Sequence, residues 1–271
     1  MIKKSPLNYS GSKDKIVKDI IKYIPEDTKT FVDAFGGAFN VGINVDTEKV
    51  VYNEINPYVV GVIKMLLQED KEGLIEQIEN TIERFNLQAR NQTTYNAFRN
   101  YYNDVEKTPL NLYILSLYSF SNIIRFNKKE KFNASIGKQE YNSTIIDRIL
   151  NFTPEAEKVD MLNLSYKDIP LDIFDSKTLF YFDPPYITTQ GVYNETNRLG
   201  NGWCEEDEIE FLKYLEKIDN LGYKFILSNL FSFKGNNNEY LINFVNENNF
   251  NKTTIGKTRN REEQLIFNFD I

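Results

Sequence analysis

The sequence predicts a mixed α/β fold built on a doubly wound, mainly parallel sheet. Three short apolar segments have the composition of buried strands: TFVDAF from Thr30, KVVYN from Lys49, and TLFYFD ending at Asp183. Each is followed by turn residues or by a helix start, an alternation typical of parallel sheets with crossover helices. With 271 residues, 41% of them hydrophobic, the chain can form one such domain and a smaller inserted one.

The other expected elements follow from capping signals and apolar periodicity. Asn56 followed by proline predicts a helix start after the second strand, and another helix is expected over 71–90. Acidic residues at 205–207 suit a helix N-terminus and Gly222 suits the end of the same helix. The strand YKFILSN follows it, and NKTTIG and QLIFNFD are expected to close the sheet as a hairpin.

A stretch rich in Tyr, Phe, Asn and Lys, from Asn91 to about Asn142, interrupts this alternation. It contains the apolar, helix-like segment LNLYILSLYSF and a polar second half. We therefore expect a mainly helical subdomain at 71–145, inserted into a domain that is formed by 1–70 and 146–271.

Composition excludes several classes of protein. Histidine is absent and Cys204 is the only cysteine, which excludes an internal disulfide, a zinc finger and histidine acid–base catalysis, and no metal is expected. No apolar run approaches the roughly 20 residues that span a bilayer. The N-terminal lysines are not followed by an apolar stretch either, so we expect a soluble, cytoplasmic protein that is not bound to membranes. We also expect a monomer.

The charge of the chain is acidic overall and basic in two places. The formal net charge of -7 argues against a protein that coats nucleic acid by bulk attraction. Basic residues nevertheless gather within 125–138 and at Lys252, Lys257, Arg259 and Arg261. The two segments could form one nucleic-acid-binding face, or each could be a solvated loop.

The most specific signal is the segment Asp183-Pro184-Pro185-Tyr186, directly after an apolar strand, because doubly wound sheets bind ligands beyond the carboxyl ends of their strands. The prolines remove two backbone donors and leave acceptors at Asp183 and at the Pro184 carbonyl. An exocyclic amine with two N–H groups fits these acceptors, and its lone pair then points at an electrophile while the base stacks on Tyr186. The alternative is an ordinary strand-ending turn.

This segment and the order of the surrounding motifs resemble the Dam-like DNA adenine-N6 methyltransferases over nearly the full chain. The resemblance implies a Rossmann-like class I methyltransferase sheet of seven strands, the last one antiparallel, with an inserted DNA-recognition subdomain. It implies S-adenosyl-L-methionine as the methyl donor, double-stranded DNA as the partner and N6 of a flipped adenine as the target. A cognate restriction endonuclease as a further partner stays open.

The same resemblance implies residues that hold the methyl donor: Tyr9, Lys13, Asp33, Phe35, Gly36, Glu54, Ile55, Ser165, Tyr166 and Asp183. The first two lie in an aromatic-x-Gly-x-Lys element, and the next three in a glycine-containing loop that also suits a plain strand-to-helix turn. Glu54 stands where an acidic side chain accepts hydrogen bonds from both ribose hydroxyls. Ser165 and Tyr166 border the adenine of the donor, with Asp168 as a weaker candidate.

Within the inserted stretch, the segment from Ser119 resembles the target-recognition segment of the family and implies these DNA-binding residues: Phe120, Arg125, Asn127, Lys128, Lys129 and Lys131. Arg125 is expected to grip guanine O6 and N7, and the lysines are expected to contact phosphates. Phe120 either wedges into the base stack or packs in the core of its helix.

Three other functions remain open: methylation of cytosine N4, methylation of adenine in RNA, and binding of DNA without catalysis. By family analogy, the aspartate at the first motif position favours adenine. The intact motif from Asp183 to Tyr186, together with Lys13 and Glu54, argues against a protein that binds DNA without catalysis.

Overall fold

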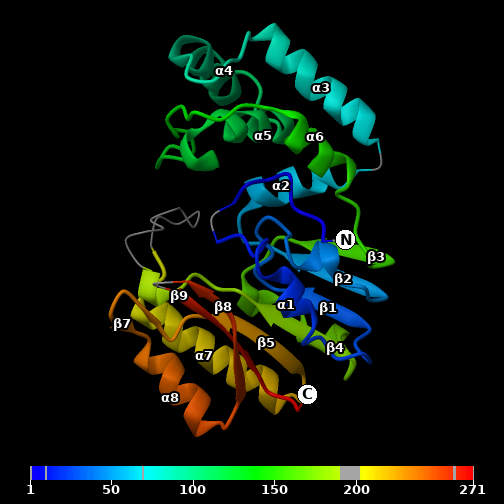
Figure 1. Ribbon diagram of the computed structural model, residues 1–271, viewed down its shortest axis with the longest axis vertical. Coiled ribbons are helices and arrows are strands. Elements are labelled where there is room, and N and C mark those ends of the chain that lie inside the picture. The colour runs from blue at the N-terminus through cyan, green and yellow to red at the C-terminus, as the bar shows by residue number, and fades with distance from the viewer. Residues whose placement is uncertain (1, 10, 69, 190–201, 259–260, 271) are drawn as a thin grey trace. The chain divides into compact units, whose positions relative to one another are not determined.

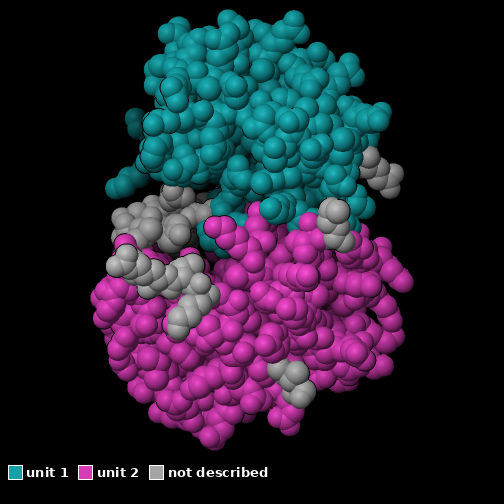
Figure 2. Space-filling model, in the orientation of Figure 1, with its two compact units in different colours: residues 1, 3–12, 56–153 teal, residues 2, 13–55, 154–271 magenta. Residues whose placement is uncertain are grey.

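The chain has a mixed α/β fold and forms two compact units (Figures 1 and 2). The computed structural model describes residues 2–9, 11–68, 70–189, 202–258 and 261–270. Apart from the first two residues, unit 1 consists of 3–12 and 56–153, and unit 2 of 13–55 and 154–271. The stretch expected as an insert, 71–145, falls within unit 1, which also takes in segments on both sides of it.

Unit 2 is built on a sheet with the strand order β3-β2-β1-β4-β5-β9-β6-β7, in which β8 also pairs with β9. The strands are β1 (Thr30–Asp33), β2 (Lys49–Asn53), β3 (Lys158–Leu162), β4 (Thr178–Phe182), β5 (Lys224–Asn229), β6 (Ser232–Phe233), β7 (Asn236–Asn237), β8 (Asn251–Thr258) and β9 (Arg261–Phe267). Strands β1 to β5 pair in parallel, whereas β9 runs antiparallel to β5 and to β8. The expected Rossmann-like α/β class and its antiparallel last strand are confirmed.

The sheet has nine strands among the described residues rather than the seven expected. The two additional strands, β6 and β7, are two residues long and form a hairpin through Lys234 and Gly235. Both turn residues have positive φ, 50° and 86°, which matches the right-handed twist of paired strands. Phe233 joins this hairpin to β9 opposite Arg261. Strands of two residues are too short to form an apolar run, so the sequence did not predict this hairpin.

Alternate residues of each strand face opposite sides of the sheet, and each side has its own helices. On one side lie α7 (Glu205–Asn220) and α8 (Glu239–Glu247) (Figure 1). Their buried residues pack against Phe180, Phe182 and Leu227. On the other side, the chain just after α1 (Val17–Ile21) places the ring of Tyr23 5.8 Å from that of Phe267. Both sides of the sheet are therefore covered.

Unit 1 is helical, with α2 (Pro57–Leu66), α3 (Lys71–Arg84), α4 (Gln92–Asp104), α5 (Pro109–Tyr118) and α6 (Ser143–Leu150). Helix α5 is buried from Asn111 to its end and contacts α2, α3 and α4. Helix α3 was expected to continue to residue 90 and ends at Arg84. The reason is Asn86, whose φ of 47° lies in the left-handed region that terminates helices.

Candidate active site

The carboxyl ends of neighbouring parallel strands bring the motif residues of unit 2 to one edge of the sheet. Asp33 is the last residue of β1, Glu54 follows β2, Asp183 follows β4 and Asn229 ends β5. These strands are hydrogen-bonded in register, so their ends meet even though the residues are far apart in the sequence.

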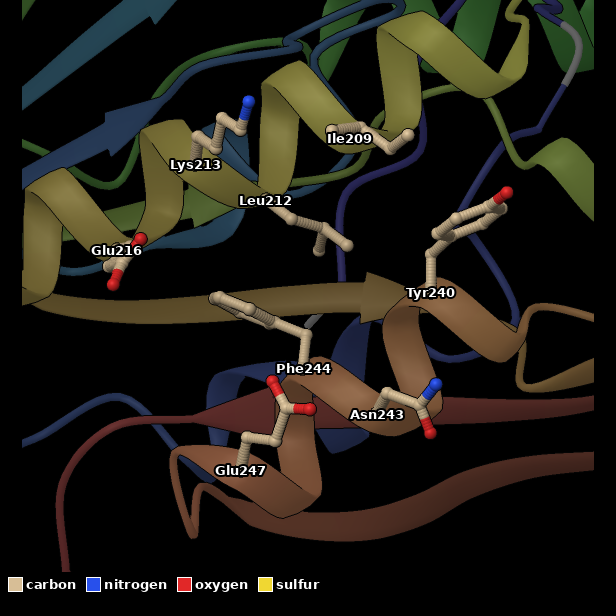
Figure 3. A pocket seen from close by; sticks show the side chains of 8 residues that line it. All are labelled: Ile209, Leu212, Lys213, Glu216, Tyr240, Asn243, Phe244 and Glu247. Carbon is tan, nitrogen blue, oxygen red and sulfur yellow. The ribbon is translucent and has the colours of Figure 1, made fainter.

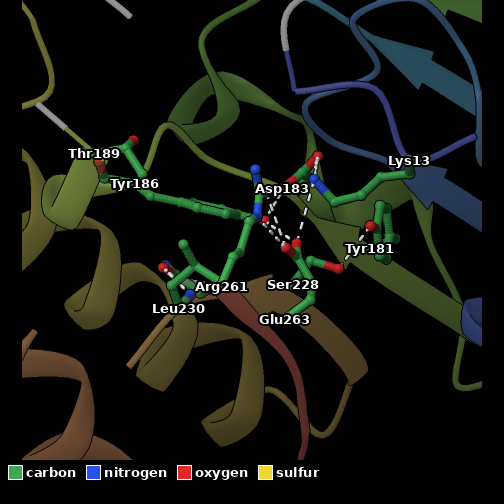
Figure 4. A network of polar contacts seen from close by, with 10 residues as sticks. Lys13, Tyr181, Asp183, Tyr186, Thr189, Ser228, Leu230, Arg261 and Glu263 are labelled. Atoms are coloured by element: carbon green, nitrogen blue, oxygen red, sulfur yellow. Dashed lines mark hydrogen bonds and ion pairs between the residues drawn. The ribbon is translucent and has the colours of Figure 1, made fainter. Parts of the chain in front are cut away.

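A network of polar contacts surrounds Asp183 (Figure 4). The Nζ of Lys13, a residue 4% exposed and lying just before α1, is 2.5 Å from Asp183 Oδ2 and 3.4 Å from Glu263 Oε1. The hydroxyl of Tyr186 lies 2.7 Å from Asp183 Oδ1 and 2.5 Å from Glu263 Oε1. Arg261 donates two hydrogen bonds to the other oxygen of Glu263, at 3.0 and 2.9 Å. Two cations therefore compensate two carboxylates in the interior.

The two carboxylates of this network have opposite pKa shifts. Burial raises the pKa of Asp183 above its ordinary value, opposed by the Lys13 cation and reinforced by the charge of Glu263. Burial would raise the pKa of Glu263 as well, but Lys13 and Arg261 together hold it below its ordinary value. The pKa of Tyr186 is raised well above its ordinary value by burial, so its hydroxyl remains a hydrogen-bond donor.

The loop after β1 is fixed by the two acidic residues expected to hold the donor. Asp33 Oδ2 accepts a hydrogen bond from the Gly42 N–H at 3.2 Å, and Glu54 Oε2 accepts one from the Gly37 N–H at 3.2 Å. Burial raises the pKa of Asp33 to about 7, and the charges of Asp183 and Glu54 add to this shift. The acidic groups at the neighbouring strand ends thus disfavour the ionised form of Asp33.

Gly36 is required by packing against β2. A Cβ at this position would lie 2.4 Å from the ring of Tyr52 and 3.2 Å from the Asn53 carbonyl oxygen. The loop therefore needs glycine here for a close approach within the fold, whatever a ligand adds.

Beside this loop, Phe35 belongs to an aromatic cluster. Its ring centroid lies 5.3 Å from that of Tyr166, 6.2 Å from that of Trp203 and 5.8 Å from that of Phe211. Tyr166 follows Ser165, the residue that precedes a short 3-10 turn after β3. The structure thus brings Phe35 and Tyr166 into contact.

Of two further expected donor-binding residues, one is exposed and the other belongs to unit 1. Ile55 is 42% exposed, and Asn163 binds its carbonyl oxygen and that of Glu54. Tyr9 belongs to unit 1, whereas Lys13 belongs to unit 2.

The expected DNA-binding residues of unit 1 lie on an exposed loop. Arg125 donates to the side-chain and main-chain oxygens of Asn133, at 3.0 and 2.9 Å, so its guanidinium is held in place. Asn127 accepts from the N–H groups of Lys129 and Lys131 and closes the turn between them. The turn is exposed from Asn127 to Lys131.

Phe120 follows α5 and is 57% exposed, which excludes the alternative that it packs in the core of that helix. Among the lysines, Lys131 is in an ion pair with Asp104, at 2.5 Å, on the surface of the unit.

Sequence reasoning missed Glu263 and its contact with Arg261. Arg261 was counted in a basic segment that could form a nucleic-acid-binding face or a solvated loop. In the structure it binds Glu263, because the register of β9 places both beside Tyr186. Of the same group, Arg259 and the side chain of Lys257 lie outside the described residues. The available signal was the pair Glu262 and Glu263, because two consecutive residues of a strand face opposite sides of the sheet.

A separate surface pocket lies between α7 and α8, lined by Ile209, Leu212, Lys213, Glu216, Tyr240, Asn243, Phe244 and Glu247 (Figure 3). None of the motif residues contributes to it. Across the part of the chain that the structure describes, no helix is both long and apolar enough to cross a bilayer. No cluster of three potential metal ligands was found there either.

Comparison with known proteins gives one family and several relatives. The family model for D12 class N6 adenine-specific DNA methyltransferase matches residues 9–260. The modification methylase LlaI of Lactococcus lactis subsp. lactis is 43% identical over 98% of this chain and 44% of its own length. The type II methyltransferase M.FokI of Planomicrobium okeanokoites is 35% identical over 97% of this chain and 42% of its own. A DNA adenine methylase of Vibrio cholerae is 26% identical over 78% of this chain and 75% of its own.

The chain thus spans less than half the length of the first two relatives. The family match covers all the segments that carry the resemblance, from Tyr9 through Asp183-Pro184-Pro185-Tyr186, which confirms the resemblance to the Dam-like enzymes. This chain belongs to the D12 class N6 adenine-specific DNA methyltransferase family.

Proposed function

We propose that this chain transfers the methyl group of S-adenosyl-L-methionine to N6 of an adenine flipped out of duplex DNA. The observation that carries the proposal is the Asp183-Pro184-Pro185-Tyr186 segment at the carboxyl end of β4, with Lys13 beside its carboxylate. Membership of the family supports the reaction class and the target base.

The residues at the sheet edge fit a cationic nucleoside donor. The charges of Glu54 and Asp183 oppose the ionisation of Asp33, and a positively charged ligand would relieve that repulsion. The buried Asn229 Nδ2 at the end of β5 has no hydrogen-bond partner among the described residues. Such a donor is costly to bury unless a ligand or water accepts from it. Glu54 would bind the ribose hydroxyls, and Phe35 and Tyr166 would border the adenine ring.

The chain's own residues position the reacting amine. S-Adenosyl-L-methionine supplies an activated methyl group when bound. The Asp183 carboxylate accepts one N–H of the adenine amine and the Pro184 carbonyl accepts the other, so the nitrogen lone pair is directed toward the donor. Pro185 removes a competing backbone donor, and Tyr186 provides an aromatic surface for the flipped base.

Unit 1 would supply the sequence recognition. Phe120 is exposed for a contact with the base stack, and Arg125 presents a pre-oriented guanidinium for guanine. The turn that includes Lys128, Lys129 and Lys131 would contact phosphates, with Asn127 holding the turn.

A labelled-methyl assay on DNA tests the proposal. Wild-type protein is expected to label duplex DNA, and chromatography of the hydrolysed nucleosides is expected to find N6-methyladenine. Asp183→Ala is expected to abolish labelling while it leaves DNA affinity largely intact, because Asp183 acts on the flipped amine rather than on the duplex. Asp172→Ala, at an exposed aspartate outside the site, is the matched control.

Label recovered on cytosine N4, or only on RNA, would replace the target base or the nucleic acid in this proposal. DNA binding without any transfer from fresh donor would establish a protein that binds DNA without catalysis. Because relatives carry the names of modification and type II methylases, we also propose a cognate restriction endonuclease as partner. DNA from expressing cells should then resist the endonuclease that cuts the methylated site.

A further inference from the structure

The Tyr186 hydroxyl has two carboxylate acceptors and a single proton. A phenol can therefore donate fully to only one of Asp183 and Glu263 at a time. The contact with Glu263, at 2.5 Å, is shorter than the contact with Asp183, at 2.7 Å (Figure 4). When Tyr186 donates to Glu263, Asp183 Oδ1 becomes available to another donor.

Lys13 has the same two acceptors, with the opposite preference. Its ammonium lies closer to Asp183 than to Glu263, at 2.5 and 3.4 Å. An ammonium is a stronger donor than a neutral amine, so Lys13 competes with a target base for the Asp183 carboxylate. Glu263 is a second carboxylate within reach that can take over part of this ion pair.

Glu263 is itself held in one orientation. Both hydrogen bonds from Arg261 go to Oε2, which leaves Oε1 facing Tyr186 and Lys13. The residue is 3% exposed, and the nearby cations keep its pKa low, so its charge persists at neutral pH. A buried carboxylate fixed by a two-pronged guanidinium contact is a rigid acceptor.

We propose that Glu263 is a positioning residue of the methyl-transfer site, which draws the Tyr186 hydroxyl and Lys13 toward β9 so that Asp183 can accept the target amine. The proposal rests on the function proposed above. Glu263 acts through Asp183, Tyr186 and Lys13 and does not itself touch the base.

Glu263→Gln tests this role, because it keeps the side-chain shape and removes the charge. We expect kcat to fall about tenfold to a hundredfold, the range for a hydrogen bond to a charged group, with little change in KM for DNA or donor. Calorimetry on the donor alone is expected to give wild-type affinity. Glu262→Gln removes the same charge from the neighbouring exposed residue and is expected to leave kcat unchanged.

The pH profile separates positioning from a general structural role. Several titratable groups surround Asp183: Lys13 in the segment before α1, Asp33 in β1, Glu263 in β9, and the hydroxyls of Tyr181 and Tyr186. Since the Glu263 charge raises the pKa of Asp183, the acidic limb of kcat should move to lower pH in Glu263→Gln. Loss of fold alone would lower the amount of active enzyme without moving that limb.

Glu263→Asp keeps the charge and shortens the side chain, so it should retain the wild-type acidic limb while kcat remains reduced. This variant also decides the matter if Glu263→Gln does not fold. A kcat equal to that of the wild type in either variant, or an unmoved acidic limb in Glu263→Gln, overturns the inference about Glu263. The proposed function still stands in that case, as long as the wild-type protein transfers methyl groups. Absence of transfer by the wild type overturns the proposed function itself.

Discussion

Replacement of Asp33 by asparagine should remove a large pH dependence of stability. Asp33 is 2% exposed, and burial raises its pKa from 3.8 to about 7. Because folding raises this pKa, the folded state favours the protonated carboxyl. Its contribution to stability is fully present below pH 3.8 and is lost as pH rises through about 7.

The size of the effect follows from the shift. Each pKa unit corresponds to about 1.4 kcal/mol, so a shift of about three units amounts to about 4 kcal/mol in total. Between pH 5 and 7, where the folded state mostly holds the proton and the unfolded state mostly does not, wild-type stability relative to Asp33→Asn should fall by about 2 kcal/mol. Asparagine keeps an oxygen that can accept the Gly42 N–H, so the comparison isolates the charge.

Urea unfolding of both proteins at half-unit steps from pH 5 to 8 measures this difference. Titrating groups far from Asp33 are common to both proteins and cancel in the subtraction. Asp172→Asn, at an exposed aspartate, should show no such drift. A wild-type minus Asp33→Asn difference that stays constant within about 0.5 kcal/mol across this range would refute the burial argument for the sheet edge.

Three further predictions concern the donor, the DNA and the fold of unit 1. Glu54→Ala should weaken S-adenosylmethionine and S-adenosylhomocysteine alike, because a ribose contact is common to both; unchanged affinity for either in calorimetry contradicts this. Arg125→Ala should weaken binding to the cognate duplex by about 1–3 kcal/mol and relax discrimination at one base pair. Lys129→Ala should instead weaken binding to all duplexes evenly and lower the slope of log affinity against log salt by about one. If Arg125→Ala lost affinity evenly across all duplexes, Arg125 would be only a phosphate contact. Gly137→Ala should destabilise the protein by about 1–3 kcal/mol, because its Cβ would lie 2.5 Å from a backbone carbonyl oxygen. Gly202→Ala should not, because among the described residues no atom beyond its chain neighbours lies within 4 Å of the added Cβ.

Much of the sheet could be predicted because its strands are short apolar runs between turn signals. The segments at β1, β2, β4 and β5 are buried on both faces, so they are nearly continuous in Val, Phe, Tyr and Leu. Strand β3 was missed because KVDML is only half buried and carries a lysine and an aspartate. Its place at the edge of the sheet allows that composition.

Local sequence also determined the helix starts and the chemistry of one turn. Asn56 caps α2 through the Tyr58 N–H, followed by Pro57, and Gly222 has the positive φ expected after α7. Asp183-Pro184-Pro185-Tyr186 carries its acceptors and its ring within four residues, so it needed no partner from elsewhere to be noticed.

Tertiary structure alone decided which charges meet. Lys13, Asp183 and Glu263 are separated by 170 and by 80 positions in the sequence, and no periodicity links them. They meet because β4 and β9 both border β5, one parallel and one antiparallel, which brings the start of β9 to the carboxyl end of β4. The start of β9 also brings Arg261, which the sequence placed in a basic segment, into contact with the buried carboxylate of Glu263. Sequence by itself determined the strands, the caps and the reactive turn, because these depend on neighbours along the chain. The pairing of charges depends on strand order and register, which only the folded sheet sets.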